Sequence, residues 1–505
     1  MLTCRTEASS ASSFLIWGVV FATSLWPWLP SPGLLHCAAG NTSLPPLPIL
    51  PIPSLPQLQW QRRKMIMFFH FGMNTFTDSE WGSGHEDPRL FNPSSLDTKQ
   101  WVSVAKAAGV SLVILTAKHH DGFCLWPSMY TNHSVRYSPW RNGRGDVIAE
   151  LAAATRQEGI DLGLYLSPWD RHDHRYGNTL LYNEYYMAQL HELLTRYGEI
   201  SEVWFDGAKG ADAPKMRYMF KRWFAVAHQL QPGINIFSDA GPDVRWVGDE
   251  KGFCAPTCWS LFNASHAQIG SGANPKLLNS GDPHGMNWVP PECDVSIRAG
   301  WFWHKHERPK SPLTLLDLYY NSVGRNCVLL LNVPPNSSGL LSPGDIHTLL
   351  TFKQMRNAIF ASNLASNSTV HIHASSQRLG QPFHPFNLID GRPDTFWAAA
   401  QGHTHATITI TFKHPITFNV VELQEPIELG QRVAKYLVRV WENSDWQLFS
   451  SGTTIGFRKL DRNCTVKASQ VQLVIRKSRA EPLISGFALY RDLVSKPSSF
   501  CSSSL

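Results

Sequence analysis

Two acidic side chains stand directly after stretches of β-forming, mostly apolar residues. Asp206 lies in SEVWFDG at 201–207, and Glu250, next to Asp249, closes VRWVGDE at 244–250. An unpaired carboxylate inside a buried sheet is unfavourable by several kcal/mol, so we place both groups at strand ends, partly desolvated. Cleaving an acetal requires an acid that protonates the leaving oxygen and a carboxylate that attacks or stabilises the anomeric carbon. The pair predicts hydrolysis of a glycosidic bond, whereas an aspartate that caps the following loop is the structural alternative.

Adjacent histidines, His119 and His120, end another strand-like stretch, in TAKHHDGF. Neutral imidazoles donate to and accept from sugar hydroxyls, which suits a carbohydrate site. A metal is the rival explanation, because a ligand set could be completed by Asp121, His172, Asp173 and His174. No HExxH or similar spacing supports that set, so we expect neither a metal nor another cofactor.

Near-continuous apolar strands alternate with amphipathic helices over the first two thirds of the chain. The strand-like stretches are 64–72, 110–120, 160–167, 200–206, 234–239, 244–250 and 327–335, and the helical ones are 96–108, 146–158, 179–196, 214–230 and 312–323. This alternation indicates a parallel sheet that is covered on both faces. Asp146 is well placed to cap the helix that follows it.

A doubly wound sheet and a barrel both fit this alternation, and two observations favour the barrel. No glycine-rich dinucleotide motif follows the first strand. Polar residues end many strands, namely His70, His119, His120, Ser167, Asp206 and Glu250. Because barrel enzymes build their sites on that rim, we predict a (β/α)8-like (TIM) barrel.

The pattern changes near Ser362, where short alternating runs separated by turns predict a C-terminal antiparallel β-sandwich. We divide the chain into a signal peptide and leader at 1–39, the catalytic barrel at 40–361, the sandwich at 362–495 and a disordered tail at 496–505.

The apolar stretch at 14–30, followed by small residues up to Ala39, is typical of a secretory signal peptide. A membrane anchor is the alternative, but Pro27 and Pro30 interrupt the stretch before the roughly 20 residues that a span needs. Six Asn-x-Ser/Thr sequons are consistent with export, at Asn41, Asn132, Asn263, Asn336, Asn367 and Asn463. We therefore expect a secreted, extracellular glycoprotein without a membrane segment.

Of nine cysteines, Cys4 and Cys37 leave with the signal peptide, so seven remain and at least one thiol is unpaired within the chain. Cys254 and Cys258 could pair locally, although the sequence leaves the connectivity open. No second closely spaced cysteine or histidine pair completes a zinc site. The net charge of +6 is mild and unclustered, so we expect no nucleic-acid partner.

Several motifs together resemble the α-L-fucosidases of glycoside hydrolase family 29. They are FFHFGMNTF, SEWG, AKHHDGF, GLYLSPW, VWFDG and RWVGDE, and the match runs from Lys64 to Pro335. The variants HFGMNTF and VRWVGDE resemble the subfamily that prefers α-1,3/1,4-linked fucose, and the whole chain resembles secreted plant members. NLIDGRPDTFWAA in the sandwich is similar to discoidin-like modules, for which we favour a structural role over sugar binding.

The resemblance implies a retaining exo-acting enzyme, with Asp206 as nucleophile and Glu250 as acid/base. It implies fucose-binding roles for His70, Glu80, Trp81, His119, His120, Tyr165, Trp204, Arg298 and Trp301, with Trp303 as an alternative to Trp301. The expected substrates are fucosylated glycans or glycoproteins in the plant apoplast or cell wall. A fucose-binding, lectin-like protein without turnover and an enzyme for α-1,2-linked fucose of the xyloglucan type remain alternatives.

Overall fold

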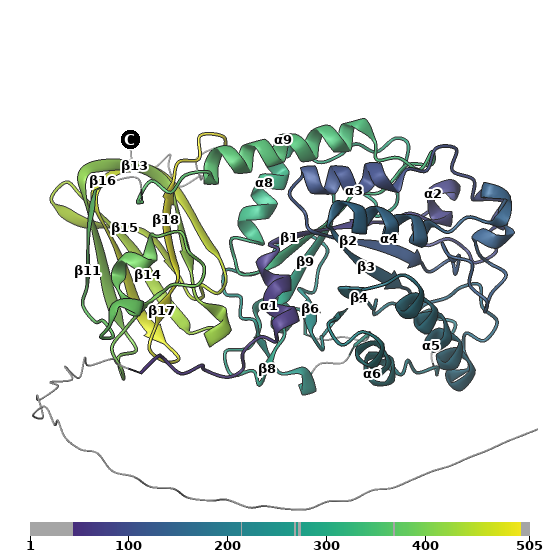
Figure 1. Cartoon of the computed structure of the whole chain (residues 1–505), viewed down its shortest axis with the longest axis horizontal. Helices are drawn as coiled ribbons and strands as arrows, with labels where there is room; N and C mark the ends of the chain where they lie inside the picture. The colour runs from purple at the N-terminus through teal and green to yellow at the C-terminus, as the bar shows by residue number, and fades with distance from the viewer. Residues whose placement is uncertain (1–43, 214, 267–268, 271–273, 367–368, 496–505) are drawn as a thin grey trace, which may run out of the picture. The chain divides into compact units, whose positions relative to one another are not determined.

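In the computed structural model of the chain, residues 44–495 are described, apart from 214, 267–268, 271–273 and 367–368 (Figure 1). The predicted signal peptide, the sequons at Asn41 and Asn367, and the predicted tail lie outside the described residues. None of the described helices combines the length and the apolar character that crossing a bilayer would take. The described residues form a closed barrel and an antiparallel sheet domain, which confirms the predicted fold class.

Eight strands close the barrel in the order β1-β10-β9-β6-β5-β4-β3-β2. They are β1 Met65–Phe69, β2 Leu112–Lys118, β3 Asp161–Leu166, β4 Glu202–Trp204, β5 Asn235–Ser238, β6 Val244–Trp246, β9 Pro291–Ser296 and β10 Val328–Asn332. Every neighbouring pair is parallel, so all carboxyl ends meet at one rim.

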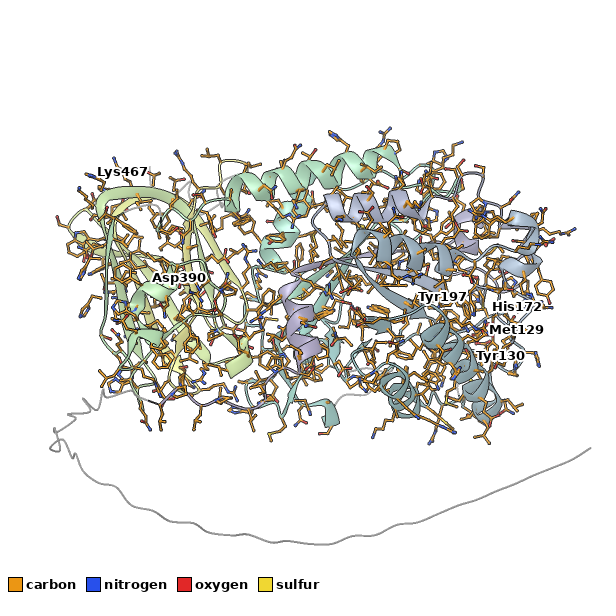
Figure 2. The ribbon with its side chains drawn as sticks, viewed as in Figure 1. Met129, Tyr130, His172, Tyr197, Asp390 and Lys467 are labelled. Atoms are coloured by element: carbon orange, nitrogen blue, oxygen red, sulfur yellow. A yellow bond between two sulfur atoms is a disulfide. The ribbon has the colours of Figure 1, made fainter. Side chains whose placement is uncertain are left out.

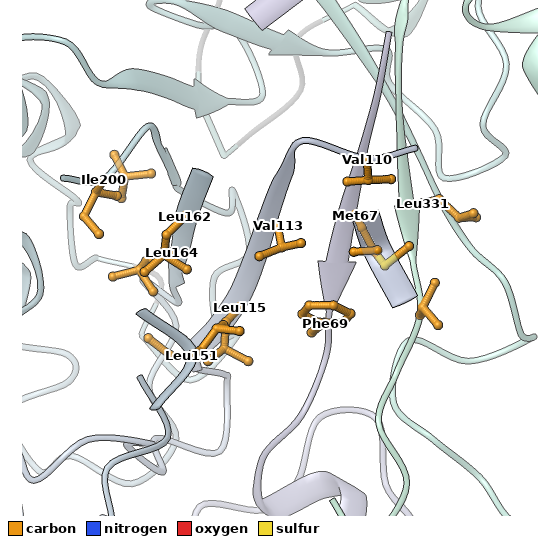
Figure 3. Packing of buried hydrophobic residues seen from close by; sticks show 14 of the residues in the cluster. Met67, Phe69, Val110, Val113, Leu115, Leu151, Leu162, Leu164, Ile200 and Leu331 are labelled. Carbon is orange, nitrogen blue, oxygen red and sulfur yellow. The ribbon is translucent and has the colours of Figure 1, made fainter. Parts of the chain in front are cut away.

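Successive side chains of these strands point alternately to the two sides of the barrel wall. Met67 and Phe69 of β1 belong to the core between the strands and the helices, together with Leu151 of helix α4, Val147–Glu158 (Figure 3). Ile66 and Phe68 of the same strand belong to a separate cluster that fills the barrel interior. Both sides of each strand are therefore buried, which explains the near-continuous apolar sequences.

Helices lie outside the strands of the barrel (Figure 1). The α-helices are α1 Leu55–Arg62, α2 Met73–Thr77, α3 Thr98–Ala107, α4 Val147–Glu158, α5 Thr179–Arg196, α6 Phe220–Leu230, α7 Pro275–Ser280, α8 Pro312–Asn321 and α9 Pro343–Phe360. The 3₁₀ helices are Pro88–Leu90, Val135–Tyr137, Trp140–Gly143, Ala264–His266, Gln381–Phe383, Pro385–Leu388 and Ile427–Leu429. As predicted, Asp146 caps α4, because its carboxylate accepts a hydrogen bond from the backbone N–H of Ala149 at 2.9 Å.

The helix predicted for 214–230 begins later, at Phe220. The backbone N–H of Arg217 donates to the hydroxyl of Thr179 at 3.2 Å, and that of Met219 donates to the side chain of Asn183 at 2.8 Å. Both partners lie on α5. These N–H groups are satisfied outside a helix, which delays its start.

Strand β9 has no counterpart among the predicted strands. All six of its residues are buried, yet its sequence is PECDVS. Glu292, Asp294 and Ser296 alternate with Cys293 and Val295, so one face of the strand is polar and the other apolar. Strand β9 is thus a fully buried strand without an apolar run.

The C-terminal part of the chain forms an antiparallel sheet domain with a core of its own. Its six-stranded sheet consists of β11 Val370–Ala374, β13 Ala406–Gln424, β14 Val433–Glu442, β15 Asp445–Gly452, β16 Lys459–Ser478 and β18 Gly486–Tyr490. In the same domain, a short two-stranded ribbon pairs β12 Trp397–Ala398 with β17 Leu483–Ile484. A second ribbon, of β7 Leu261–Phe262 and β8 Asn287–Trp288, lies between β6 and β9 in the barrel part of the chain. Two predicted strands, HATITITF and FNVVELQE, are one strand, β13, with a register shift between Thr411 and Ile416.

Candidate active site

One pocket at the carboxyl rim of the barrel gathers nearly all predicted site residues. It is lined by Phe68, His70, Glu80, Trp81, His119, His120, Tyr165, Trp204, Asp206, Glu250, Asp294 and Trp301. Among the described residues, Arg298 is the predicted site residue that this lining does not include. The volume of about 140 Å³ is below the roughly 300–1,000 Å³ of sites for drug-sized ligands, so the pocket suits one small unit.

Asp206 follows β4 and is held by two hydrogen bonds. Its Oδ2 accepts from the hydroxyl of Tyr165 at 2.9 Å, and its Oδ1 accepts from the backbone N–H of Ala208 at 2.8 Å. The Nε2 atom of His120 lies 3.8 Å from Oδ2. The carboxylate therefore has a fixed orientation in a half-buried position at the rim.

His120 is buried, and its hydrogen-bond partner defines its tautomer. The hydroxyl of Ser167 donates to the carbonyl of Trp169 at 2.6 Å, so Nδ1 of His120 must donate to that hydroxyl oxygen at 2.7 Å. Burial lowers the pKa of His120, against the opposing effect of Asp206. In the neutral ring, Nε2 is consequently an acceptor that faces the pocket.

His70 and His119 complete a set of neutral imidazoles. Burial lowers the pKa of His70 to about 3 and that of His119 well below its usual value. Nδ1 of His70 donates to the side-chain oxygen of Asn332 at 2.9 Å, which leaves Nε2 as an acceptor. The side-chain amide of Asn74 donates to Nδ1 of His119 at 3.3 Å, which leaves Nε2–H as a donor. The pocket thus offers both kinds of partner that sugar hydroxyls need.

Glu250 follows β6 and lies at the solvent-exposed edge of the pocket. Its Oε2 accepts from the indole N–H of Trp301 at 2.9 Å. Desolvation raises the pKa of Glu250, the Trp301 hydrogen bond opposes this, and the negative charges of Asp206 and Glu80 raise it further. Asp249 does not line the pocket, and its Oδ1 accepts from the backbone N–H of Lys251 at 3.0 Å.

Glu80 holds the segment that carries Trp301. Its two carboxylate oxygens accept from the backbone N–H groups of Trp301 and Phe302, at 2.9 and 3.1 Å. His304 bonds the same carboxylate at 2.7 Å. Although burial lowers the pKa of His304, the carboxylates of Glu80 and Asp78 raise it overall. In this structure Glu80 positions its neighbours as well as lining the pocket.

Arg298 has a different environment from the one expected. It is buried, its Nε donates to Asp345 at 3.0 Å, and it also bonds the carbonyl of Glu307. Glu307, whose carbonyl Arg298 bonds, also accepts from the backbone N–H of Gly300 at 3.0 Å, directly before Trp301 in the chain. The structure therefore supports a positioning role for Arg298 and gives it no place in the pocket lining.

Two lining residues, Phe68 and Asp294, were not predicted. Asp294 lies on β9 and is buried, which raises its pKa well above the usual value, and the nearby Glu250 adds to this. The indole N–H of Trp246 donates to Asp294 at 2.8 Å and opposes the shift. The alternation within PECDVS is the sequence signal that would have revealed Asp294.

Two larger hollows lack this arrangement. One of about 860 Å³ is lined by basic and apolar side chains between Lys209 and Arg222 and by Ile269 and Gly270, without a carboxylate among its described lining residues. Another of about 450 Å³ contains His133 and His172, whose rings stack at 4.1 Å (His172 is labelled in Figure 2). The second hollow also contains Glu86 and Asp87, but Asp87 is paired with Arg89 at 2.7 Å and Glu86 accepts from the hydroxyl of Ser83 at 2.8 Å. The smaller pocket at the barrel rim is therefore the better candidate for a hydrolytic pair of carboxylates.

The predicted rival ligand set is not brought together as a metal site. Among the described residues, the group of histidines, cysteines and acids close enough to share an ion consists of Cys254, Cys293 and Cys327. None of these lines the pocket.

Comparison with known proteins agrees with the fold and identifies the family. The α-L-fucosidase family model matches residues 60–355, and the F5/8 type C domain model matches residues 371–486. Alpha-L-fucosidase 1 of Arabidopsis thaliana is 54% identical over 450 residues, which cover 88% of this chain and 89% of that protein.

Solved structures extend this similarity to three dimensions. The crystal structure of SpGH29 has a TM-score of 0.85 and 40% identity, covering 88% of this chain and 100% of that one. A Ruminococcus gnavus family 29 fucosidase in complex with fucose has a TM-score of 0.84 and 34% identity, covering 90% and 97%. With a family model over more than half of its length and a relative of this identity, the chain belongs to the α-L-fucosidase family of glycoside hydrolases.

Proposed function

We propose that this α-L-fucosidase is secreted, acts on chain ends with retention of configuration, and prefers α-1,3/1,4-linked fucose of glycoprotein N-glycans or oligosaccharides. The observation that carries the proposal is the difference between two carboxyl groups in one pocket. Asp206 is held in one orientation by the hydroxyl of Tyr165 and the backbone N–H of Ala208, whereas desolvation and negative neighbours raise the pKa of Glu250. One group is suited to attack and the other to carry a proton.

In the first step, Asp206 attacks the anomeric carbon while protonated Glu250 donates to the leaving oxygen. In the second step, ionised Glu250 takes a proton from water, which releases fucose from Asp206. Neutral His70, His119 and His120 bind the sugar hydroxyls without adding positive charge beside the developing oxocarbenium ion. The small volume of the pocket is consistent with a single terminal sugar.

Retention is tested by trapping. A 2-deoxy-2-fluoro fucosyl fluoride should label Asp206 covalently, which mass spectrometry of peptides locates, and the first fucose released should be the α anomer by NMR. For Glu250→Ala, azide should restore turnover and yield α-fucosyl azide. Asp249→Asn is the matched control, because this neighbouring carboxylate does not line the pocket and should retain activity. Initial release of β-fucose would contradict the double-displacement mechanism.

Substrate preference and export are tested separately. Release of fucose is measured from Lewis-type trisaccharides, from an α-1,2-fucosylated xyloglucan oligosaccharide and from a core-fucosylated N-glycan. A preference for the xyloglucan substrate would contradict the proposed linkage, and binding without any release would favour the lectin-like alternative. Expressed with its own N-terminus in plant cells, the protein should appear in the medium and begin at Gly40. Retention inside the cell would contradict export.

A further inference from the structure

Four cysteines of the barrel lie together away from the pocket. Cys254, Cys258, Cys293 and Cys327 form one buried cluster with Val247. Cys293 and Cys327 are joined by a disulfide, and the sulfur of Cys254 lies within 4.8 Å of both of their sulfurs. Cys254 and Cys258 are free thiols.

Cys254 and Cys258 belong to the same buried cluster and to the same loop, and the thiol of Cys254 donates to the backbone carbonyl of Arg325 at 3.3 Å. The backbone holds them in place on both sides. Cys254 donates its N–H to the carbonyl of Asn321 at 3.1 Å and accepts from Arg325 at 2.7 Å. The carbonyl of Cys258 accepts from Asn326 at 3.1 Å. The two cysteines are thus held in one cluster by contacts that do not depend on a bond between them.

We propose that Cys254 and Cys258 form a disulfide in the exported protein, and that this bond anchors the loop that carries Glu250. Cys254 lies four residues after Glu250 in the same loop that follows β6. Because both cysteines belong to that loop, the bond would close a short ring within it and restrict the part of the loop that follows Glu250, beside the disulfide that joins Cys293 of β9 to Cys327. The anchoring role rests on the proposed acid/base function of Glu250.

The chemistry needs one oxidant and balances as thiol–disulfide exchange. The thiolate of Cys258 attacks a sulfur of a small disulfide, such as oxidised glutathione, and displaces one thiolate. The thiolate of Cys254 then attacks Cys258, forms the new bond and expels the second thiolate. The order of the two attacks can also be reversed, because either cysteine leads to the same bond. Because both thiols are buried in the folded chain, the exchange belongs to the folding stage.

The proposed bond also agrees with the odd number of cysteines expected after export. Cys464 is disulfide-bonded, and Cys293 pairs with Cys327. With Cys254 joined to Cys258, Cys124 is the cysteine without a disulfide among those in residues 44–495. It is buried, and its sulfur accepts from the side chain of Gln189 at 3.3 Å.

Peptide mapping of the full-length secreted protein tests the bond without any variant. Trypsin cuts at Lys251 and at Lys276, so both cysteines fall in one peptide, 252–276. After alkylation under denaturing, non-reducing conditions and enzymatic removal of N-glycans, this peptide should lack alkyl groups and be two hydrogens lighter than its dithiol form. After reduction it should take two alkyl groups. The proposal would be overturned if the peptide took two alkyl groups before reduction, or if it were crosslinked to the peptides of Cys293 or Cys327. It would also be overturned if native mass spectrometry showed a bound zinc ion.

The anchoring role is tested by comparing kcat/KM for two substrates whose leaving groups differ in their need for an acid. For Cys254→Ser and Cys258→Ser, kcat/KM should fall about tenfold on a fucosylated oligosaccharide, whose departure needs an acid, and about twofold on a nitrophenyl fucoside. Cys124→Ser is the control, because it removes a buried thiol outside the cluster and should affect both substrates equally. If Cys254→Ser and Cys258→Ser each lowered kcat/KM by the same factor on the oligosaccharide and on the nitrophenyl fucoside, the anchoring role would be overturned. Failure to trap Asp206 would instead count against the proposed mechanism, whatever the peptide map shows.

Discussion

Replacing Trp301 with phenylalanine removes one hydrogen bond from Glu250 and leaves the surrounding segment in place. The indole N–H of Trp301 donates to Oε2 of Glu250 at 2.9 Å. The backbone of residue 301 is held independently, because its N–H donates to Glu80 and its carbonyl accepts from Asn332. Phenylalanine also retains an aromatic ring near His70, whose ring centre lies 4.9 Å from that of Trp301.

The structure sets the size and the sign of the effect. A hydrogen bond to a charged group is worth about 1.5–3 kcal/mol, and we take the lower value because Glu250 is exposed at the rim. About 1.4 kcal/mol corresponds to a tenfold change in rate. The bond favours the ionised carboxylate, so its loss raises the pKa of Glu250. We expect kcat/KM for an oligosaccharide to fall about tenfold, while its basic limb moves to higher pH.

The assay is the pH profile of kcat/KM, since its basic limb reports the acid group of the free enzyme. Trp303→Phe is the matched control, because that indole donates to the hydroxyl of Ser342 at 3.1 Å and does not contact Glu250. A basic limb that moved to lower pH in Trp301→Phe, or that moved equally in both variants, would refute the assignment of Glu250 as the acid controlled by Trp301.

Three further outcomes are expected. Burial raises the pKa of Asp121 to about 7 and that of Asp239 to about 6. Each of these two acids binds a proton more tightly in the folded state, so its contribution to stability falls from pH 4 towards pH 7 by about 1.4 kcal/mol per pH unit, whereas the lowered pKa values of buried His70 and His119 act in the opposite sense. In thermal unfolding, Asp121→Asn should therefore lose less stability over this range than the unchanged protein; an unchanged pH dependence would contradict the raised pKa of Asp121. Asp294→Asn should retain more activity than Asp294→Ala, because burial disfavours a charge on Asp294 and an amide oxygen can still accept the hydrogen bond from Trp246; equal losses in steady-state kinetics would contradict this. Serines at Cys293 and Cys327 should lower the free energy of unfolding in urea by about 3–4 kcal/mol, since the disulfide closes a loop with a sequence separation of 34; no change would show that the bond is absent in solution.

Most of the barrel could be predicted because both faces of its strands are buried in apolar surroundings. Strands β1, β2 and β3 were recognised from their apolar runs, and Asp146 marked the start of α4. Strand β9 escaped because its buried acids, Glu292 and Asp294, read as a surface pattern. The start of α6 escaped because its preceding N–H groups bond side chains of another helix, which no local pattern encodes.

The residues of the site could be predicted where they directly follow barrel strands, because parallel strands bring their carboxyl ends to one rim. Position along the strands is enough to place Asp206 and His120 in one pocket, but it does not say which way a loop residue turns. Arg298 follows β9 as closely as His120 follows β2, yet it pairs with buried Asp345. The bond between Trp301 and Glu250 joins two loops, and only the folded chain reveals it.

The buried acids beneath the pocket bear on how its charge is distributed. Burial raises the pKa of Asp294 and of Glu292 well above the usual values, so a negative charge on either acid is disfavoured. Glu292 accepts from the indole of Trp204 at 2.8 Å, directly below the strand end that carries Asp206. Two ionised groups there would repel Asp206 and hold Glu250 protonated too strongly for it to act as a base in the second step. Burial of these acids on β9 therefore disfavours further negative charge beside Asp206 and Glu250, the two groups that act at the anomeric carbon in the proposed mechanism.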